Sequence, residues 1–148
     1  GSVFSTNAAF VDTTTLGLGL NGIAISDDQS ALIVGTFIPA ALYRVSLTNS
    51  SNVMRITLNG DALPSPDGLA FLAGDLYAVS DRSVSRVRLN ADASEGTVST
   101  REQISGLSTA TVAEDSLYVI KSEVTNSVLN APLNLPFEIF SLDVSTFE

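Results

Sequence analysis

Gly19-Leu-Asn-Gly-Ile-Ala-Ile-Ser-Asp-Asp28 recurs in the chain as Pro66-Asp-Gly-Leu-Ala-Phe-Leu72. Each stretch places an amide or carboxylate residue before a glycine and then enters an apolar segment typical of a β-strand. A weaker third copy is Ser108-Thr-Ala-Thr-Val-Ala113. If these are copies of one unit, Asn21 and Asp67 occupy equivalent positions in neighbouring repeats. We therefore expect their side-chain oxygens to converge on one centre.

Each of the three quoted stretches is followed by further short apolar segments separated by polar turns. No segment shows the 3.6-residue period of a helix. The expected strands are 22–26, 31–37, 42–47 and 53–58 in the first unit, and 68–72, 76–80, 84–89 and 97–104 in the second. The third unit offers 109–113, 117–121 and 137–143, with a fourth strand absent or reduced to 144–148. A four-stranded antiparallel unit that recurs about every 45 residues is typical of a β-propeller blade.

The expected fold is therefore all-β, a propeller of about three blades that forms half of a six-bladed ring. Residues 1–20, with β-prone pieces at 3–5 and 10–11, are assigned to the tail of a preceding blade. Residues 21–60 and 61–106 are assigned to whole blades, and 107–148 to an incomplete one. A generic β-sandwich is the alternative. Closed propellers need about four to eight blades, and an open half leaves sheet edges exposed. We expect a partner, either the N-terminal half of the propeller as a separate chain or a second copy.

Composition excludes several kinds of chemistry. The 148 residues contain no Cys and no His, which rules out disulfides, thiol catalysis and a Ser-His-Asp triad within the chain. Seven basic against sixteen acidic residues give a net charge of −9, which argues against a nucleic-acid partner. No apolar run is long enough to span a membrane. Asn49-Ser-Ser51 is a glycosylation sequon on an expected loop and gives slight support for secretion, but the localisation stays open.

The quoted blade starts, together with Leu42-Tyr-Arg-Val-Ser-Leu47, resemble the C-terminal half of six-bladed propellers of the SMP-30/gluconolactonase/LRE-like family. In metal-dependent members of that family, the Asn of the first motif and the Asp of the second bind a divalent cation on the central axis. The resemblance implies the same for Asn21 and Asp67, with Ca²⁺, Mg²⁺ or Zn²⁺ as the ion or no metal at all. The family's first-blade Glu ligand lies upstream of this chain's residues.

Amide and carboxylate oxygens suit a hard divalent cation. Such a site would polarise a lactone or ester carbonyl for hydrolysis, with Asp67 as the catalytic base. The alternative interpretation is that Asn-Gly and Asp-Gly are turn residues, whose glycine accepts a positive φ. The expected substrate pocket adds residues near the same ends of the strands: Thr36, Phe37, Asp81, Thr109, Lys121 and Leu129.

Other function classes stay open. The loops 36–41 and 121–136 are largely apolar, which favours an apolar small-molecule substrate and non-hydrolytic chemistry, such as condensation or cycloaddition of a natural-product intermediate. A non-catalytic binding propeller is the third possibility, because the chain holds no complete catalytic set.

Overall fold

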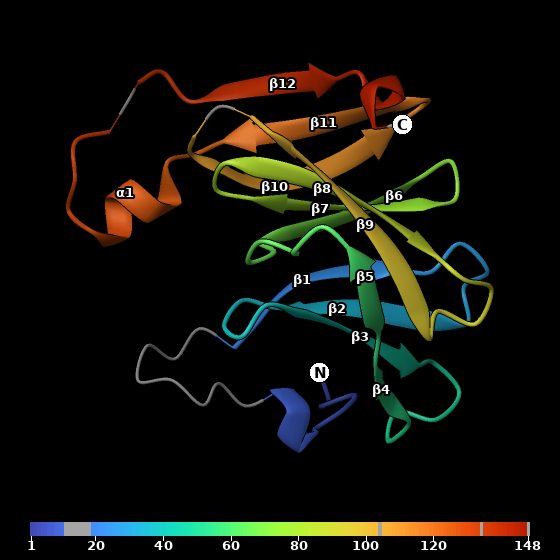
Figure 1. Cartoon of the computed structure of the whole chain (residues 1–148). Coiled ribbons are helices and arrows are strands. Elements are labelled where there is room, and N and C mark those ends of the chain that lie inside the picture. The colour runs from blue at the N-terminus through green and yellow to red at the C-terminus, as the bar shows by residue number, and fades with distance from the viewer. Residues whose placement is uncertain (11–18, 104, 134, 148) are drawn as a thin grey trace.

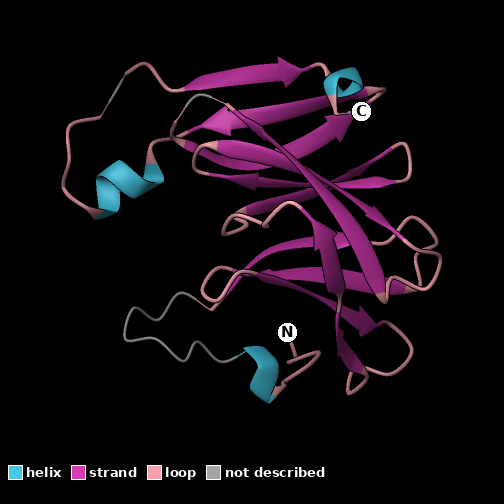
Figure 2. Ribbon diagram, viewed as in Figure 1, coloured by secondary structure: helices cyan, strands magenta, loops and turns pink. Residues whose placement is uncertain are grey.

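Three β-sheets lie one above another in the computed structural model, which describes residues 1–10, 19–103, 105–133 and 135–147 (Figure 1). Strands dominate, and helices are confined to short turns in the connections (Figure 2). In the part of the chain that the structure describes, no helix is long and apolar enough to cross a membrane. The all-β expectation is confirmed.

The first sheet is a four-stranded antiparallel meander that follows the expected unit closely. Its strands in spatial order are β1 (Leu20–Ile25), β2 (Ala31–Thr36), β3 (Ala41–Ser46) and β4 (Val53–Arg55). The polar turn after β1 is closed by Asp28, whose carboxylate accepts hydrogen bonds from Ser26 Oγ and the Ser30 amide. Short polar turns of this kind let successive strands pair with their neighbours in sequence.

The second sheet contains five strands, one more than the sequence predicts. Its spatial order is β5 (Thr57–Gly60), β9 (Glu95–Glu102), β8 (Ser83–Leu89), β7 (Asp75–Ser80) and β6 (Gly68–Leu72). The expected strand 53–58 is therefore split. The Ile56 amide still bonds the Leu42 carbonyl of the first sheet, whereas the Thr57 amide bonds the Ser94 carbonyl of the second. From there β5 runs parallel to β9, and this crossing ties the two sheets together.

The third sheet has three strands in the described residues: β10 (Leu107–Ala113), β11 (Ser116–Lys121) and β12 (Glu138–Leu142). In place of a fourth strand, the 3₁₀-helix η2 (Val144–Thr146) leads to the buried Phe147. The connection before β12 contains the short helix α1 (Val124–Val128), which the sequence pattern does not predict. The β-prone piece 3–5 is not a strand, and η1 (Ala8–Phe10) includes the start of the second piece; residue 11 lies outside the described residues.

Two hydrophobic cores fill the spaces between consecutive sheets. Ile33, Leu42, Leu69 and Leu76 belong to the core between the first and second sheets. The core between the second and third sheets takes its side chains from the opposite faces of the same middle strands, and they pack against Leu117, Val119 and Phe147. Because successive side chains of a strand point to opposite faces, the middle sheet is apolar on both sides. Its strand β7, Asp-Leu-Tyr-Ala-Val-Ser, is correspondingly buried almost throughout.

The strands that open the three units, β1, β6 and β10, lie next to one another. A Cβ added to Gly22 would lie 2.8 Å from the Asp67 carbonyl, and one added to Gly68 would lie 2.5 Å from the Thr109 Cα. Positive φ among the described glycines occurs at Gly60, Gly74 and Gly106 and not at these two. The repeated glycine therefore serves close approach between sheets, and the interpretation as a turn residue of positive φ is wrong.

Candidate functional site

Three equivalent positions open the inner strands β1, β6 and β10. The pairing of β1 with β2 is irregular between Leu20 and Ile23, which places Asn21 in a bulge. Asp67 immediately precedes β6, and its amide donates to the Val79 carbonyl at 2.7 Å. Ser108 lies in a similar irregularity at the start of β10. Bulges redirect side chains and are frequent beside active sites, so these positions form the first part of a candidate site.

Asn21 and Asp67 meet across the boundary between the first and second sheets. The Asn21 side chain hydrogen-bonds the half-buried carboxyl of Asp67. Desolvation raises the pKa of Asp67, the hydrogen bond from Asn21 opposes that rise, and the negative charge of Asp81 adds to it. The side chains of the two equivalent residues are thus in contact, with a second carboxylate close by. A carboxyl with a raised pKa is a better general base near neutral pH than an ordinary surface aspartate.

Replacing Asp67 with Asn is expected to stabilise the metal-free protein at neutral pH. Since the native state raises the pKa of Asp67, it holds that proton more tightly than the unfolded chain does. The free energy of unfolding therefore falls as the pH rises through that pKa, and the uncharged amide removes this loss. Urea denaturation should show the widest gap between D67N and the unsubstituted chain at pH 7. The gap should narrow as the pH falls below the pKa of Asp67.

Asp28→Asn is the control of opposite sign. Hydrogen bonds lower the pKa of Asp28 to about 2; the largest contribution comes from the Ser26 side chain and the next from Ser30. Its carboxylate stabilises the fold above the pKa of the unfolded chain, and this contribution is lost as the pH falls toward about 2. D28N should therefore be less stable than the unsubstituted chain at pH 7. A shift of both variants in the same direction at pH 7 would contradict the environment assigned to Asp67.

Asp81 and Lys121 lie at the ends of the second strands of their units. The Asp81 carbonyl accepts a hydrogen bond from the Leu107 amide, which joins this position to the third sheet, and its carboxylate pairs with Arg82 at 3.5 Å. Lys121 Nζ pairs with the buried Glu123 at 3.7 Å and with Glu138 at 3.2 Å. Lys121 is therefore a mostly buried cation that two carboxylates hold in place. Asp81, in contrast, acts through its negative charge, which raises the pKa of Asp67 in addition to the larger effect of desolvation.

The other expected pocket residues lie at separate points. Thr36 Oγ1 donates to the Pro39 carbonyl and is buried, and the Phe37 amide donates to the Gly19 carbonyl. Thr109 is on β10 against Gly68. Leu129 ends α1 and is largely exposed. Of the expected set, the structure therefore brings Asn21, Asp67 and Asp81 together.

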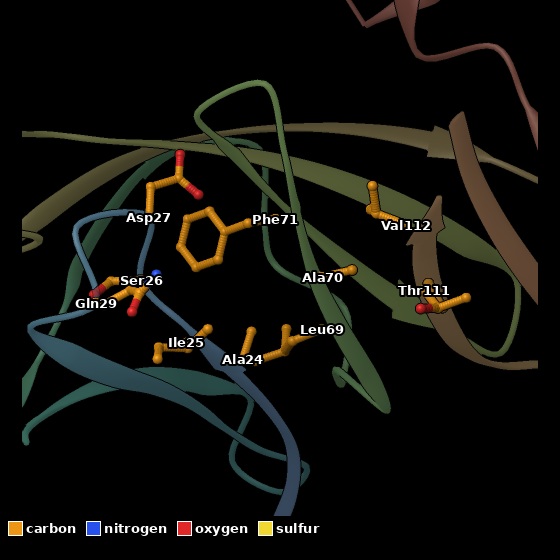
Figure 3. Close-up of a pocket in the computed structure, with 11 residues that line it drawn as sticks. Ala24, Ile25, Ser26, Asp27, Gln29, Leu69, Ala70, Phe71, Thr111 and Val112 are labelled. Carbon is orange, nitrogen blue, oxygen red and sulfur yellow. The ribbon is translucent and has the colours of Figure 1, made fainter. Parts of the chain in front are cut away.

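A hollow of about 370 Å³ lies further along the same inner strands, and no sequence pattern indicates it. It is lined by side chains from the middle of β1, β6 and β10 and from the turn after β1, including Ala24, Leu69, Phe71 and Thr111 (Figure 3). Its size falls within the range of about 300–1,000 Å³ that is usual for small-molecule sites. None of Asn21, Asp67 and Asp81 lines it. A hollow with both apolar and polar lining residues thus lies on the same inner strands as the polar cluster.

The donor set of the polar cluster fits a hard cation only in part. Ca²⁺ takes about six to eight oxygen ligands, and Mg²⁺ takes six with several waters. Asn21, Asp67 and Asp81 offer an amide and two carboxylates. Within residues 1–10, 19–103, 105–133 and 135–147, no group of three or more His, Cys, Asp or Glu side chains is arranged to hold a metal. Zn²⁺ fits poorly because its usual ligands, His and Cys, are absent from the sequence.

The solved structures that are similar to this chain include a fungal allergen and a bacterial lyase. The major allergen Mala s 1 of Malassezia sympodialis aligns with a TM-score of 0.68 and 16% identity over 90% of this chain and 44% of that one. Virginiamycin B lyase of Staphylococcus aureus aligns with a TM-score of 0.52 and 16% identity over 74% of this chain and 36% of the lyase. No protein-family model and no curated protein matches the chain.

The fold is that of a β-propeller, and the alternative of a generic sandwich is excluded by the same likeness. This chain spans less than half the length of either solved structure, and its three sheets do not close into a ring. At 16% identity the likeness extends to the fold alone, so membership of the SMP-30/gluconolactonase/LRE-like family stays a hypothesis.

Proposed function

We propose that this chain supplies one side of the axial pocket of a β-propeller hydrolase, similar to SMP-30/gluconolactonase enzymes, that opens a lactone or ester with the help of Ca²⁺ or Mg²⁺. The observation that supports it is the contact between Asn21 and Asp67, two oxygen-bearing side chains from equivalent positions of neighbouring sheets. The aligned chains are more than twice as long as this one, so a complete pocket would take further ligands from outside these three sheets.

Each side chain has a defined part in the proposed mechanism. Asn21 donates its amide N–H to the Asp67 carboxyl. The Oδ1 atom of Asn21 is then the atom that would act as a ligand. Asp67 holds a water molecule and accepts its proton as the water attacks the carbonyl carbon. When the tetrahedral intermediate collapses and the acyl C–O bond breaks, Asp67 returns that proton to the leaving alkoxide. Desolvation, with the negative charge of Asp81 as a smaller contribution, raises the pKa of Asp67 and so favours its acceptance of the proton. When bound, the divalent cation would supply polarisation of the substrate carbonyl.

The apolar part of the hollow favours a second candidate function, in which the pocket orients a largely apolar substrate without hydrolysis. Ala24, Leu69 and Phe71 offer dispersion contacts, and Asp27, Gln29 and Thr111 add polar groups to the lining. One of the similar structures is named a lyase, so a propeller of this fold accommodates chemistry other than hydrolysis. Catalysis would then come from orientation of the reacting groups.

Titration of the full chain with CaCl₂ and with MgCl₂ in a calorimeter tests the leading proposal. We expect the unsubstituted chain to bind one of the two ions, and Asp67→Ala to weaken that binding at least tenfold, because carboxylates dominate affinity for hard cations. Asp115→Ala removes an exposed carboxylate from the turn between β10 and β11 and serves as the matched control, with binding unchanged.

A panel of lactones and esters, assayed with and without EDTA, completes the test. Hydrolysis that needs the ion and is lost in Asp67→Ala supports the proposal. Hydrolysis that survives both EDTA and Asp67→Ala would overturn the roles proposed for the ion and for Asp67. Equal ion binding by Asp67→Ala and the unsubstituted chain would place the metal elsewhere. Ligand binding without turnover across the panel would favour a binding propeller.

A further inference from the structure

The outer face of the third sheet carries exposed apolar side chains, although the equivalent face of the middle sheet is a core. β7 and β11 share the pattern Leu-Tyr-apolar-apolar, and each pairs in the same register with its inner strand. Val79 of β7 is 0% exposed because the third sheet covers it. Its equivalent on β11, Ile120, is 38% exposed, and its cross-strand neighbour on β12, Ile139, is 72% exposed. Thr111, Tyr118 and Ser141 share this face, so Ile120 and Ile139 form an exposed apolar patch within a mixed surface.

The opposite flank of the molecule shows the complementary exposure. Leu69 of β6 is 7% exposed because it packs against the first sheet. Its equivalent on β1, Ile23, is 58% exposed, and Leu20 and Ile25 on the same strand are each 49% exposed. The inner strand of the first sheet therefore exposes apolar side chains like those that β6 packs against the first sheet. On β2 and β3 the side chains of the same face, such as Val34 and Tyr43, are buried, and Tyr43 packs against Phe10.

One internal contact defines how the two flanks would meet. A Cβ on Gly35 of β2 would lie 3.7 Å from Leu69 Cδ1 across the boundary between the first and second sheets. Gly35 is the repeat equivalent of Ile120, and Leu69 is the equivalent of Ile23. A sheet that follows the third one would therefore place a residue like Ile23 against Ile120. This chain carries such a sheet itself.

We propose that the outer face of the third sheet docks on the outer face of the first sheet of a second copy, and that two copies related by a two-fold axis close into a six-sheet ring. A head-to-tail contact makes a closed ring when its rotation closes and a filament when it does not. Closure at two copies is supported by length, because this chain aligns with 44% of the Mala s 1 chain. Six sheets lie within the usual range of about four to eight for propellers.

The spacing between facing sheets is larger at the contact between copies than at the contacts within one copy. Thr109 takes the place of Gly68 on the inner strand, and Ile120 takes the place of Gly35 on the second strand. Both substitutions enlarge the side chains at the boundary, so the third sheet and the partner's first sheet lie farther apart than the sheets within a chain. The apolar residues at the contact carry no charge, whereas each copy has a net charge of −9. Added salt should therefore strengthen the pair by screening the repulsion.

Light scattering coupled to size exclusion measures the mass of the assembly. We expect twice the 15.5 kDa of one chain, with the dimer fraction rising between low salt and about 0.5 M NaCl. Ile23→Asp and Ile139→Asp should each shift the mass to one chain while the far-ultraviolet circular dichroism spectrum stays that of the β-fold. Val128→Asp, on an equally exposed apolar residue of α1, is the control and should leave the dimer intact.

Cysteine cross-linking tests the head-to-tail geometry, because the chain has no cysteine of its own. Ile23→Cys and Ile120→Cys proteins are prepared separately and then mixed under mild oxidation. The proposal expects disulfide-linked dimers in the mixture and far fewer in either protein alone. Cross-linking of each protein with itself as fast as in the mixture would overturn the head-to-tail arrangement. A monomer at all concentrations and salt levels would overturn the docking of a second copy and favour a separate chain as the occupant.

Discussion

Replacing Gly68 with Ala should destabilise the protein by about 3 kcal/mol, the upper part of the usual range for overpacked sites. The added Cβ would lie 2.5 Å from the Thr109 Cα, 2.8 Å from Thr109 Oγ1 and 2.9 Å from the Ala110 amide nitrogen. Two of these three atoms are backbone atoms of β10, which its hydrogen bonds to β11 hold in place. The inner strands β6 and β10 must therefore separate, and part of the core between the second and third sheets opens with them.

Thermal unfolding followed by circular dichroism measures this effect. A loss of about 3 kcal/mol corresponds to a drop in Tm of roughly 10 °C for a chain of this size. Gly1→Ala is the matched control, since a Cβ on Gly1 meets no atom within 4 Å, and its Tm should not change. Gly22→Ala should lie between the two, because one of its nearest atoms is the flexible Leu69 side chain. A Gly68→Ala protein as stable as Gly1→Ala would show that β6 and β10 are not in close contact.

The order of strands could be predicted from the sequence because each unit repeats the same alternation of apolar segments and polar turns. The starts of β1 and β6 follow from the repeated amide or carboxylate before glycine, whereas β10 has Ser108-Thr109 in its place and follows from the apolar pattern alone. The division of strand 53–58 could not be predicted in this way. Ile56 is apolar and continues the strand pattern, but its side chain enters the core between the first and second sheets. The hydrogen-bond partner of the backbone changes at that point, and an alternating pattern carries no information about which sheet a strand joins.

The part of the candidate site that lies at equivalent positions of the repeats could be predicted from the sequence. Asn21 and Asp67 come together because equivalent residues of adjacent inner strands are neighbours, and that follows from the repeat. The part played by Asp81 depends on where the loop after β7 meets the third sheet, which is a tertiary contact. The hollow beside Leu69 and Phe71 also had no signal, because its lining residues read as ordinary strand positions. The sequence alone does not distinguish a turn glycine of positive φ from a glycine needed for close packing at positions 22 and 68. The position of the neighbouring inner strand decides for close packing.

Replacing Phe147 with Ala should cost about 3–5 kcal/mol, as deletion of a fully buried aromatic ring usually does. Phe147 follows η2 and is 1% exposed, although it lies at the end of the chain, where side chains are usually solvated. Its ring meets Tyr77 edge to face, with centroids 5.6 Å apart at 82°. It belongs to the second core, next to a third sheet that has three strands within the described residues.

Urea denaturation of Phe147→Ala beside Phe4→Ala measures that cost. Phe4 has the same ring but is about half exposed, so its truncation should change the free energy of unfolding by no more than about 0.5 kcal/mol. Tyr77→Leu keeps most of the apolar volume and removes the edge-to-face pair, and should cost less than Phe147→Ala because the core stays filled. Equal stability of the Phe147→Ala and Phe4→Ala proteins would mean that the chain end does not complete the core. A large loss would show that Phe147 is an integral part of the core between the second and third sheets.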